Sequence, residues 1–148
     1  LTVAVWFRLN GSQPTNPRLV STAPRGPLAD APGFQLALRS EAGDNIFGTV
    51  GDGSNAATIR GKKVAGSGWH HGVLTWNGTT ATLYLDGERM GRDTYRGPLS
   101  AESDLYLGST PAGTQNFRGE LDEVRYYNRS LSFGAVRNLY MNSTQDNS

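Results

Sequence analysis

Two adjacent histidines, His70 and His71, are the residues of this chain that most invite a metal-binding or catalytic interpretation. They precede the run GVLTW, which has the composition of a β-strand. Neighbouring side chains on a strand point to opposite faces, so two adjacent histidines cannot bind one metal ion together. A chelating pair would need i, i+2 spacing, and neither Trp69 nor Gly72 supplies a ligand. We therefore predict structural roles, with one histidine packed or hydrogen-bonded and the other near the surface.

Aromatic, amide and guanidinium side chains offer a second kind of chemistry, which is carbohydrate binding. A sugar site combines a flat aromatic ring, for the apolar face of a pyranose, with planar polar groups for its hydroxyls. The residues of these types on the polar sides of the strand-like runs are Trp6, Arg8, Gln35, Arg39, Trp76, Tyr84 and Tyr106. We expect them to share one face of one sheet and to bind a glycan. The alternative is that Trp6 and Trp76 are buried at a domain junction or beneath a proline-rich loop.

Short alternating runs separated by Gly, Asn and Asp must position these side chains. The strand-like runs are residues 1–9, 34–39, 71–76, 81–87, 104–108 and 121–128. Asn77-Gly78 predicts a hairpin turn, and Asp86-Gly87 predicts a second reversal. This period of two, with 19 glycines and 7 prolines in the chain, indicates an all-β fold of two antiparallel sheets. The predicted core face comprises Val3, Val5, Phe7, Leu36, Leu38, Leu83, Leu85, Leu105 and Leu107.

Two regions depart from the strand pattern. Residues 10–32 are rich in proline and predict a loop around one short strand near residues 19–21. Residues 132–141 predict a short helix, because Ser132 is a suitable N-cap and Val136, Leu139 and Tyr140 recur at helical spacing. We expect one domain over residues 1–141 and a tail or linker over residues 142–148.

The composition excludes several classes of function. The chain has no cysteine, which excludes disulfides, thiolate zinc sites and cysteine nucleophiles. A net charge of +1 does not indicate a basic surface that would attract nucleic acid or an anionic membrane. No apolar run approaches the roughly 20 residues that cross a bilayer. The sequence begins in strand-like alternation without a methionine, so we expect it to be a piece of a longer protein.

Several blocks of sequence resemble one known family. WHHGVLTWNGTTATLYLDGERMG, then DLYLGS, then FRGELDEVRYYNRSLS are similar, in order and spacing, to the laminin-G-like jelly-roll domains of the concanavalin A-like lectin/glucanase superfamily. The resemblance covers residues 1–9 and 69–140. It implies two stacked antiparallel sheets in a jelly roll, a curved groove on one of them, and a secreted or cell-surface setting. Members usually begin with a further strand, which would lie upstream of this sequence and pair with residues 121–128.

The resemblance does not extend to the catalytic motif of the superfamily. Its retaining glucanases carry E-x-D-x-x-E on one strand, which places two carboxyl groups about 5–5.5 Å apart. The nearest string here begins at Glu120 and Asp122, but Arg125 stands where the second catalytic glutamate would be. We therefore predict that the domain is not an enzyme and has no catalytic residues.

A structural calcium ion is also implied by the resemblance. Asp122 occupies the position at which relatives often hold calcium, together with nearby carbonyls and ligands from the strand that lies upstream. The alternative is an aspartate that pairs with an arginine or with the backbone. No other cofactor is expected.

These observations predict a non-catalytic, lectin-like module of a larger extracellular protein, for which a glycoside-active enzyme is one parent. Its partners would be a glycan or polysaccharide and the neighbouring domains of the same protein. The alternative is a structural or adhesion domain that packs on a neighbouring domain and binds no sugar.

Overall fold

The computed structural model of the chain describes residues 1–14, 16–22, 32–39, 43–52, 54–64, 68–99, 105–109 and 116–142. This part of the chain contains ten strands and one helix. The elements are β1 (Thr2–Leu9), β2 (Arg18–Ser21), β3 (Pro32–Arg39), β4 (Asn45–Asp52), β5 (Ala56–Lys63), β6 (His70–Trp76), β7 (Thr80–Leu85), β8 (Glu88–Thr94), β9 (Tyr106–Leu107), β10 (Gly119–Tyr127) and α1 (Phe133–Asn142).

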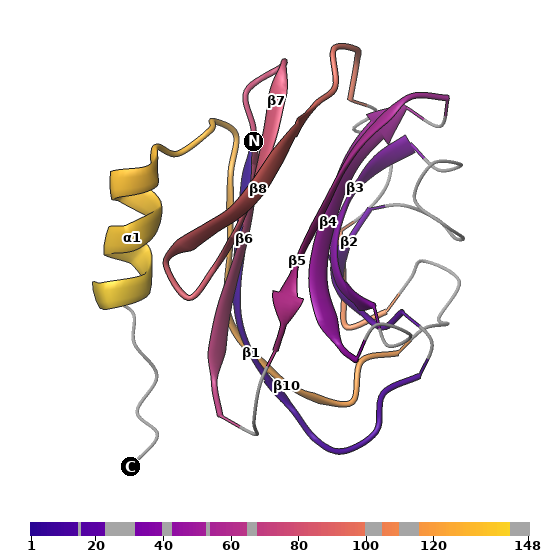
Figure 1. Cartoon of the computed structure of the whole chain (residues 1–148), viewed down its shortest axis with the longest axis vertical. Coiled ribbons are helices and arrows are strands. Elements are labelled where there is room, and N and C mark those ends of the chain that lie inside the picture. Colours follow the sequence, from indigo (N-terminus) through magenta and orange to yellow (C-terminus); the bar gives the residue numbers. More distant parts are fainter. Residues whose placement is uncertain are drawn as a thin grey trace.

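The strands form two five-stranded antiparallel sheets that face each other (Figure 1). Sheet A has the order β10-β1-β6-β7-β8, and sheet B has the order β5-β4-β3-β2-β9. Helix α1 lies on the face of sheet A that is turned away from sheet B (Figure 1). The predicted all-β jelly-roll sandwich with one short C-terminal helix is therefore confirmed.

The core lies between the sheets, where alternate residues of each strand point inward. Val3, Val5 and Phe7 of β1 meet Leu36 and Leu38 of β3, and all five are fully buried. Transfer of this apolar surface out of water stabilises the fold by about 25 cal/mol per Å².

Two residues of the predicted core lie elsewhere. Leu105 and Leu107 keep 41% and 51% of their surface exposed. They belong to the region of β9, a two-residue strand at the edge of sheet B, where a strand has a neighbour on one side only. Their alternating pattern therefore predicted burial wrongly.

Both predicted turns are present. Between β6 and β7, the Asn77 Oδ1 accepts hydrogen bonds from the backbone N–H groups of Thr79 and Thr80 at 2.9 and 2.8 Å, and Gly78 has φ 95°. Between β7 and β8, Asp86 and Gly87 have φ 52° and 79°, which is the backbone of a type I′ turn. This turn matches the right-handed twist of the two strands.

The C-terminal helix begins and ends one residue later than the sequence predicts. The Ser132 Oγ accepts a hydrogen bond from the Ala135 N–H at 3.2 Å, which confirms the predicted N-cap. The apolar side of α1 packs through Val136 and Leu139 on Ala4 and Val73 of sheet A. Of the predicted tail over residues 142–148, Asn142 belongs to α1, and residues 143–148 lie outside the described residues.

The hairpin of β4 and β5 is the part of the fold that the sequence pattern did not predict. Inward residues of β4 include Gly48, where an added Cβ would lie 2.8 Å from the Leu74 Cδ1 of the opposite sheet. Phe47 points to the other face, so apolar and polar residues do not alternate cleanly. The reversal is marked by Asp52, whose Oδ1 accepts hydrogen bonds from the N–H groups of Ser54 and Asn55.

Candidate functional site

The seven residues predicted for a sugar site do not share one face of one sheet. They separate into a pair under α1, a residue at the edge of the core, a residue near one end of sheet A, and a group of three on sheet B. The prediction of one common face is wrong, because it assigned all these strands to the same sheet. Each group has its own surroundings.

Trp6 and Tyr84 lie on the outer face of sheet A, as strand alternation predicts, but α1 covers them. Their exposed fractions are 2% and 5%. The Trp6 indole stacks on Tyr140 with centroids 5.6 Å apart, and Tyr84 stacks on Phe133 at 6.2 Å. Burial also raises the pKa of the Tyr84 hydroxyl. Neither ring presents a face on which a sugar could stack.

Trp76 faces the inside of the sandwich. It has the same strand parity as Leu74 and packs against the margin of the core. Its ring lies 5.5 Å from that of Tyr95, and its Nε1 donates a hydrogen bond to the Tyr95 carbonyl at 3.0 Å. The structure therefore gives Trp76 a packing role between β6 and the chain that follows β8.

Arg8 lies beyond the helix on sheet A. Its guanidinium forms an ion pair with Glu120 of the neighbouring strand and lies 5.1 Å from the centroid of the Trp69 ring. The side chains of Arg8 and Glu120 are 39% and 56% exposed, so this pair contributes little to stability.

Gln35, Arg39 and Tyr106 all belong to sheet B. Gln35 and Arg39 alternate with the core residues Leu36 and Leu38, so both point to the outer face, away from sheet A. Tyr106 is paired with Ser21 in β2, which in turn is paired with Gln35. Figure 1 shows that sheet B is bowed, with its hollow side turned away from sheet A.

Gln35 and Tyr106 are part of a polar row that crosses all five strands of sheet B. In-register pairing places one residue of each strand in this row: Tyr106, Ser21, Gln35, Thr49 and Thr58. With strands about 4.8 Å apart, the row spans roughly 19 Å. Every member carries a hydroxyl or an amide, groups that can exchange hydrogen bonds with sugar hydroxyls, and the two ends of the row, Tyr106 and Thr58, are partly exposed.

The centre of the polar row is buried, and two of its acceptors have no partner. Ser21, Gln35 and Thr49 are 0%, 1% and 2% exposed. Within the described part of the chain, the Gln35 Oε1 and the Thr49 Oγ1 accept no hydrogen bond. A buried polar group without a partner costs about 1–3 kcal/mol. Such groups are retained where they serve a ligand or a bound water.

Arginine side chains border the polar row. Arg18 is paired with Ala37 in the row next to the polar row, and it is 2% exposed. Its Nη1 donates a hydrogen bond to the Asn16 carbonyl at 2.9 Å. Burial lowers the pKa of the Arg18 guanidinium to about 10, so it stays protonated at neutral pH. Arg60 is exposed and Arg39 is half-buried on the same face. The face therefore combines neutral hydrogen-bonding groups with positive charge.

Sequence reasoning missed Ser21, Thr49 and Arg18 as members of this face. Thr49 was missed because β4 was not recognised as a strand. A threonine that alternates with Gly48 and Val50 is the signal that would have found it, once a hairpin had been predicted at residues 45–63.

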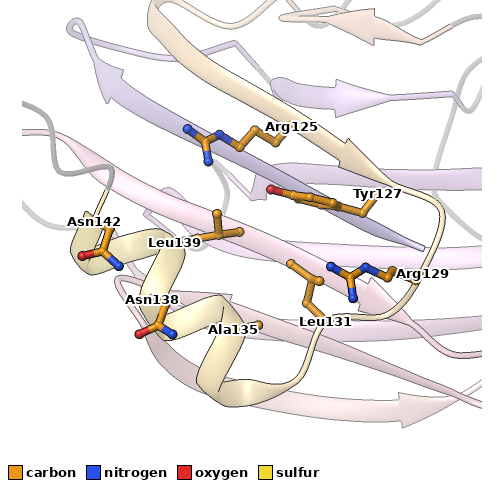
Figure 2. Close-up of a pocket in the computed structure, with 8 residues that line it drawn as sticks. All are labelled: Arg125, Tyr127, Arg129, Leu131, Ala135, Asn138, Leu139 and Asn142. Carbon is orange, nitrogen blue, oxygen red and sulfur yellow. The ribbon is translucent and has the colours of Figure 1, made fainter.

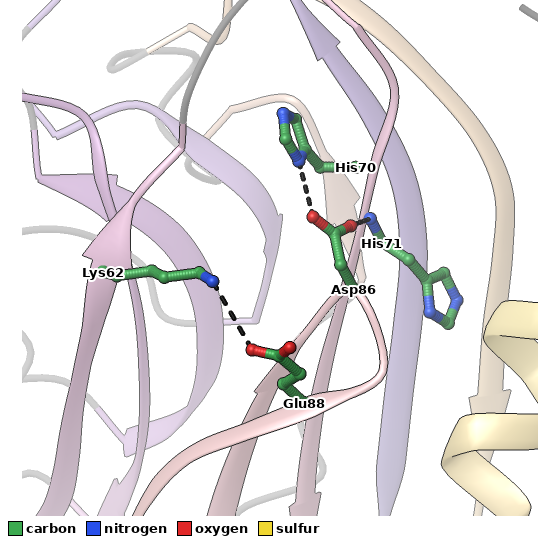
Figure 3. A network of polar contacts seen from close by, with 5 residues as sticks. All are labelled: Lys62, His70, His71, Asp86 and Glu88. Atoms are coloured by element: carbon green, nitrogen blue, oxygen red, sulfur yellow. Dashed lines mark hydrogen bonds and ion pairs between the residues drawn. The ribbon is translucent and has the colours of Figure 1, made fainter.

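The two histidines are structural, and Asp86 connects them (Figure 3). His70 Nδ1 hydrogen-bonds to the Asp86 Oδ2 at 2.7 Å, and the His71 backbone N–H donates to the Asp86 Oδ1 at 2.8 Å. The rings point to opposite faces of sheet A: His70 lies 5.9 Å from Phe7, whereas His71 lies 4.9 Å from Trp6. Alternation predicted this separation.

Burial is the main cause that lowers the pKa of His71 to about 4. The Asp86 carboxylate acts in the opposite direction and raises it, while the Arg125 guanidinium lowers it further. The His71 ring is therefore neutral at physiological pH, packed beneath α1.

The described residues do not by themselves make a calcium site at Asp122. The Asp122 side chain is exposed on β10, and its Oδ1 already accepts a hydrogen bond from the Glu123 N–H at 2.8 Å. Among these residues, no group of three His, Asp or Glu side chains lies together. Calcium prefers six to eight oxygen ligands, so further ligands would be required.

The same part of β10 contains the string closest to the glucanase motif. Glu120 is paired with Arg8, and Glu123 has φ 46° at an irregularity of the β1–β10 pairing.

In the described part of the chain no helix has the length and apolar character to cross a membrane.

Solved structures with this fold include several carbohydrate-binding modules. The CBM40 module of Ruminococcus gnavus IT-sialidase superposes with a TM-score of 0.75 at 14% identity, over 94% of this chain and 81% of that one. The same module has been solved with α2,3-sialyllactose. Domain 4 of AbnA, an extracellular arabinanase of Geobacillus stearothermophilus solved with arabinotriose, has a TM-score of 0.70 at 19% identity over 94% of this chain and 65% of that one.

A third similar structure is a whole enzyme. Trypanosoma rangeli sialidase matches with a TM-score of 0.71 at 20% identity, and the match covers 96% of this chain but only 22% of the sialidase. Among curated proteins, none is significantly similar in sequence to this chain. At these identities the superpositions establish the fold.

The family is established by sequence. The model of the laminin-G-like family described as the concanavalin A-like lectin/glucanases superfamily matches residues 1–137, which is nearly the whole chain. The paired sheets, the two hairpin turns and the C-terminal helix agree with that match. The chain therefore belongs to the concanavalin A-like lectin/glucanases superfamily.

Proposed function

We propose that this domain is a non-catalytic carbohydrate-binding module and that it binds its glycan on the outer face of sheet B. The observation that carries the proposal is the polar row with its two buried acceptors, the Gln35 Oε1 and the Thr49 Oγ1. Sugar hydroxyls are donors of the kind that both groups lack, and because the two side chains are only 1% and 2% exposed, binding requires that they become uncovered. The half-exposed Tyr106 at one end of the row offers an aromatic ring for stacking.

The charges of this face bear on the kind of glycan. Arg60 lies in the row next to the polar row, opposite Phe47, and Arg39 lies one row further along β3. Guanidinium groups hydrogen-bond to sugar hydroxyls as well as to carboxylates. The modules with the same fold were solved with α2,3-sialyllactose and with arabinotriose, which are acidic and neutral respectively. Both classes therefore belong in the first panel of ligands.

The parent would be a larger extracellular protein that uses this domain to stay on its glycan, for example a glycoside-active enzyme. Support comes from the CBM40 module of a sialidase and from domain 4 of an extracellular arabinanase, which share the fold. In the segment nearest to the glucanase motif, Arg125 replaces the second glutamate, which supports a role in binding rather than in hydrolysis.

A glycan array followed by calorimetry tests the proposal, with arabinotriose and α2,3-sialyllactose in the panel. Thr49→Val removes the hydroxyl that has no partner, so we expect an unchanged melting temperature and at least tenfold weaker binding. Thr82→Val is the matched control, since Thr82 lies on the outer face of sheet A. The proposal fails if no glycan binds, or if both variants bind as the unsubstituted chain does.

A calcium ion at Asp122 stays a prediction. If an additional strand completes the site, calcium should raise the melting temperature and a chelator should reverse the rise. Asp122→Asn would remove both effects. If calcium does not change the melting temperature of a longer protein that contains the additional strand, the site is excluded.

A further inference from the structure

A separate pocket of about 310 Å³ lies between β10 and α1, on sheet A and therefore on the other side of the molecule from the polar row (Figure 2). Its volume is within the range of small-molecule sites, which are about 300–1,000 Å³. The residues that line it are Arg125, Tyr127, Arg129, Leu131, Ala135, Asn138, Leu139 and Asn142. None of the seven residues predicted from the sequence for sugar binding is among them.

Regular structure directs these side chains into one space. Arg125 and Tyr127 are alternate residues of β10, so both face α1 from the outer side of sheet A. On the helix, Asn138 and Asn142 are one turn apart and stand on the side that borders the pocket (Figure 2). Arg129 approaches from the turn that joins β10 to α1.

The base of the pocket is apolar. Leu131 is 8% exposed, and together with Ala135 and Leu139 it belongs to the small hydrophobic cluster that attaches α1 to sheet A. The Tyr127 ring packs on the same cluster. The pocket thus combines an aromatic and aliphatic base with polar groups around its rim, which is the distribution that a pyranose ring requires.

The rim is positively charged. Of the described residues that line the pocket, two are arginines and none is acidic. Arg125 has one carboxylate nearby, Glu123, at an N–O distance of 3.8 Å, and both side chains are more than a third exposed. An exposed pair of this length contributes little free energy, so a ligand carboxylate can compete with Glu123 for Arg125. The guanidinium of Arg125 also contributes to the lowered pKa of His71, after burial as the main cause.

We propose that this pocket binds a single carboxylate-bearing sugar residue, with its carboxylate held by Arg129 and with Arg125 adding positive charge on the far side of Tyr127 (Figure 2). The ring lies on Tyr127 and the apolar base, and the hydroxyls hydrogen-bond to the side-chain amides of Asn138 and Asn142. Arginine suits this role because its planar donors match a carboxylate in two parallel hydrogen bonds. The site is independent of the glycan face on sheet B, and neither requires the other.

Heteronuclear NMR titration of the chain with methyl β-D-glucuronide tests the proposal. We expect saturable shifts of the Asn138 and Asn142 side-chain amides, at least tenfold weaker binding in Arg129→Gln, and unchanged binding in Arg137→Gln. Arg137 is an exposed arginine of α1 outside the pocket, so it controls for general charge. Thr49→Val, on sheet B, should also bind the glucuronide normally. That result separates this site from the proposed glycan face.

Three further ligands define the chemistry. Methyl β-D-glucoside carries a hydroxymethyl group in place of the carboxylate and should produce no saturable shift, whereas N-acetylneuraminic acid tests whether a larger acidic sugar fits. Sodium acetate supplies the carboxylate without the ring and should bind at least tenfold more weakly than the glucuronide. The proposal is overturned if the glucuronide gives no saturable shift, if glucoside or acetate matches it, or if Arg137→Gln weakens binding as much as Arg129→Gln.

Discussion

The ring of Tyr140 stacks on the indole of Trp6, with centroids 5.6 Å apart and an angle of 23° between the planes. This contact joins the last turns of α1 to the central part of β1. Trp6, the first aromatic residue of the chain, therefore packs against the helix, and its ring is not accessible to a ligand. The outer face of sheet A is consequently divided into a covered centre and a pocket beside β10.

Trp6→Phe should lower stability without changing glycan affinity. Phenylalanine fills less of the space between β1 and α1, and we expect a loss of about 1–2 kcal/mol in the free energy of unfolding. Urea denaturation measures the loss, and calorimetry with the glycan measures affinity. Trp69→Phe, at a half-buried position under Arg8, should change stability much less. Weaker glycan binding with full stability would contradict this account of Trp6.

Gly87→Ala should destabilise the domain more than Gly78→Ala. Both glycines have positive φ, 79° and 95°, so alanine costs about 1 kcal/mol at either turn. At Gly87 the new Cβ would also lie 2.9 Å from the Tyr140 ring, whereas at Gly78 it meets no atom within 4 Å. We expect a further loss of about 1 kcal/mol at Gly87. Tyr140→Ala should abolish this difference in a double-mutant cycle, and equal losses at both glycines would refute it.

Stability should fall as the pH falls from about 6.5 to about 4. His71 has a pKa of about 4 in the folded domain, compared with about 6.5 in an unfolded chain, so unfolding takes up a proton within this window. The contribution is complete above the higher pKa and is lost progressively below it, up to about 3 kcal/mol. Urea denaturation at several pH values should show this loss in the unsubstituted chain.

His71→Leu serves as the control because leucine keeps the ring site apolar and does not titrate. The difference in unfolding free energy between the two proteins isolates the histidine from other groups. That difference should change across the window from pH 6.5 to pH 4 and stay constant above it. A difference that does not depend on pH would show that His71 is protonated equally in the folded and unfolded states.

Asp86→Ala should cost about 2 kcal/mol, because it removes the acceptor of both histidine contacts and places alanine at φ 52°. Asp86→Asn should cost clearly less. Asparagine tolerates the left-handed backbone and can still accept the hydrogen bond from the His71 N–H. Thermal unfolding ranks the two variants, and equal losses would mean that the His71 N–H bond, which asparagine keeps, contributes nothing. In Asp86→Asn, NMR should also show a further fall of the His71 pKa, since the carboxylate raises it.

Local patterns were sufficient for most of the strands and for both turns. Alternation identified β1, β3, β6 and β7 and divided Trp6 from Phe7 and His70 from His71, because a pleated strand always sends neighbours to opposite faces. Asp86-Gly87 identified a turn whose backbone few other residues adopt. These features depend on a few residues in sequence, so the sequence predicts them without knowledge of the fold. The family resemblance then supplied the two stacked antiparallel sheets, but not which strand belongs to which sheet.

Which side chains meet was decided only by the tertiary structure. Alternation predicts that the side chains of Trp6 and Gln35 point away from the core. It does not predict that Trp6 lies beneath α1 and Gln35 on the other sheet, because both placements give the same alternation of polar and apolar residues. The row through Gln35 and Thr49 depends on the register of five strands, and the pocket beside Arg125 depends on where α1 docks. Both are set by contacts between residues far apart in the chain. The sequence alone therefore determined the two-sheet fold and the face of most residues in the strands it identified, and the packing of sheet B and α1 decided where a ligand could bind.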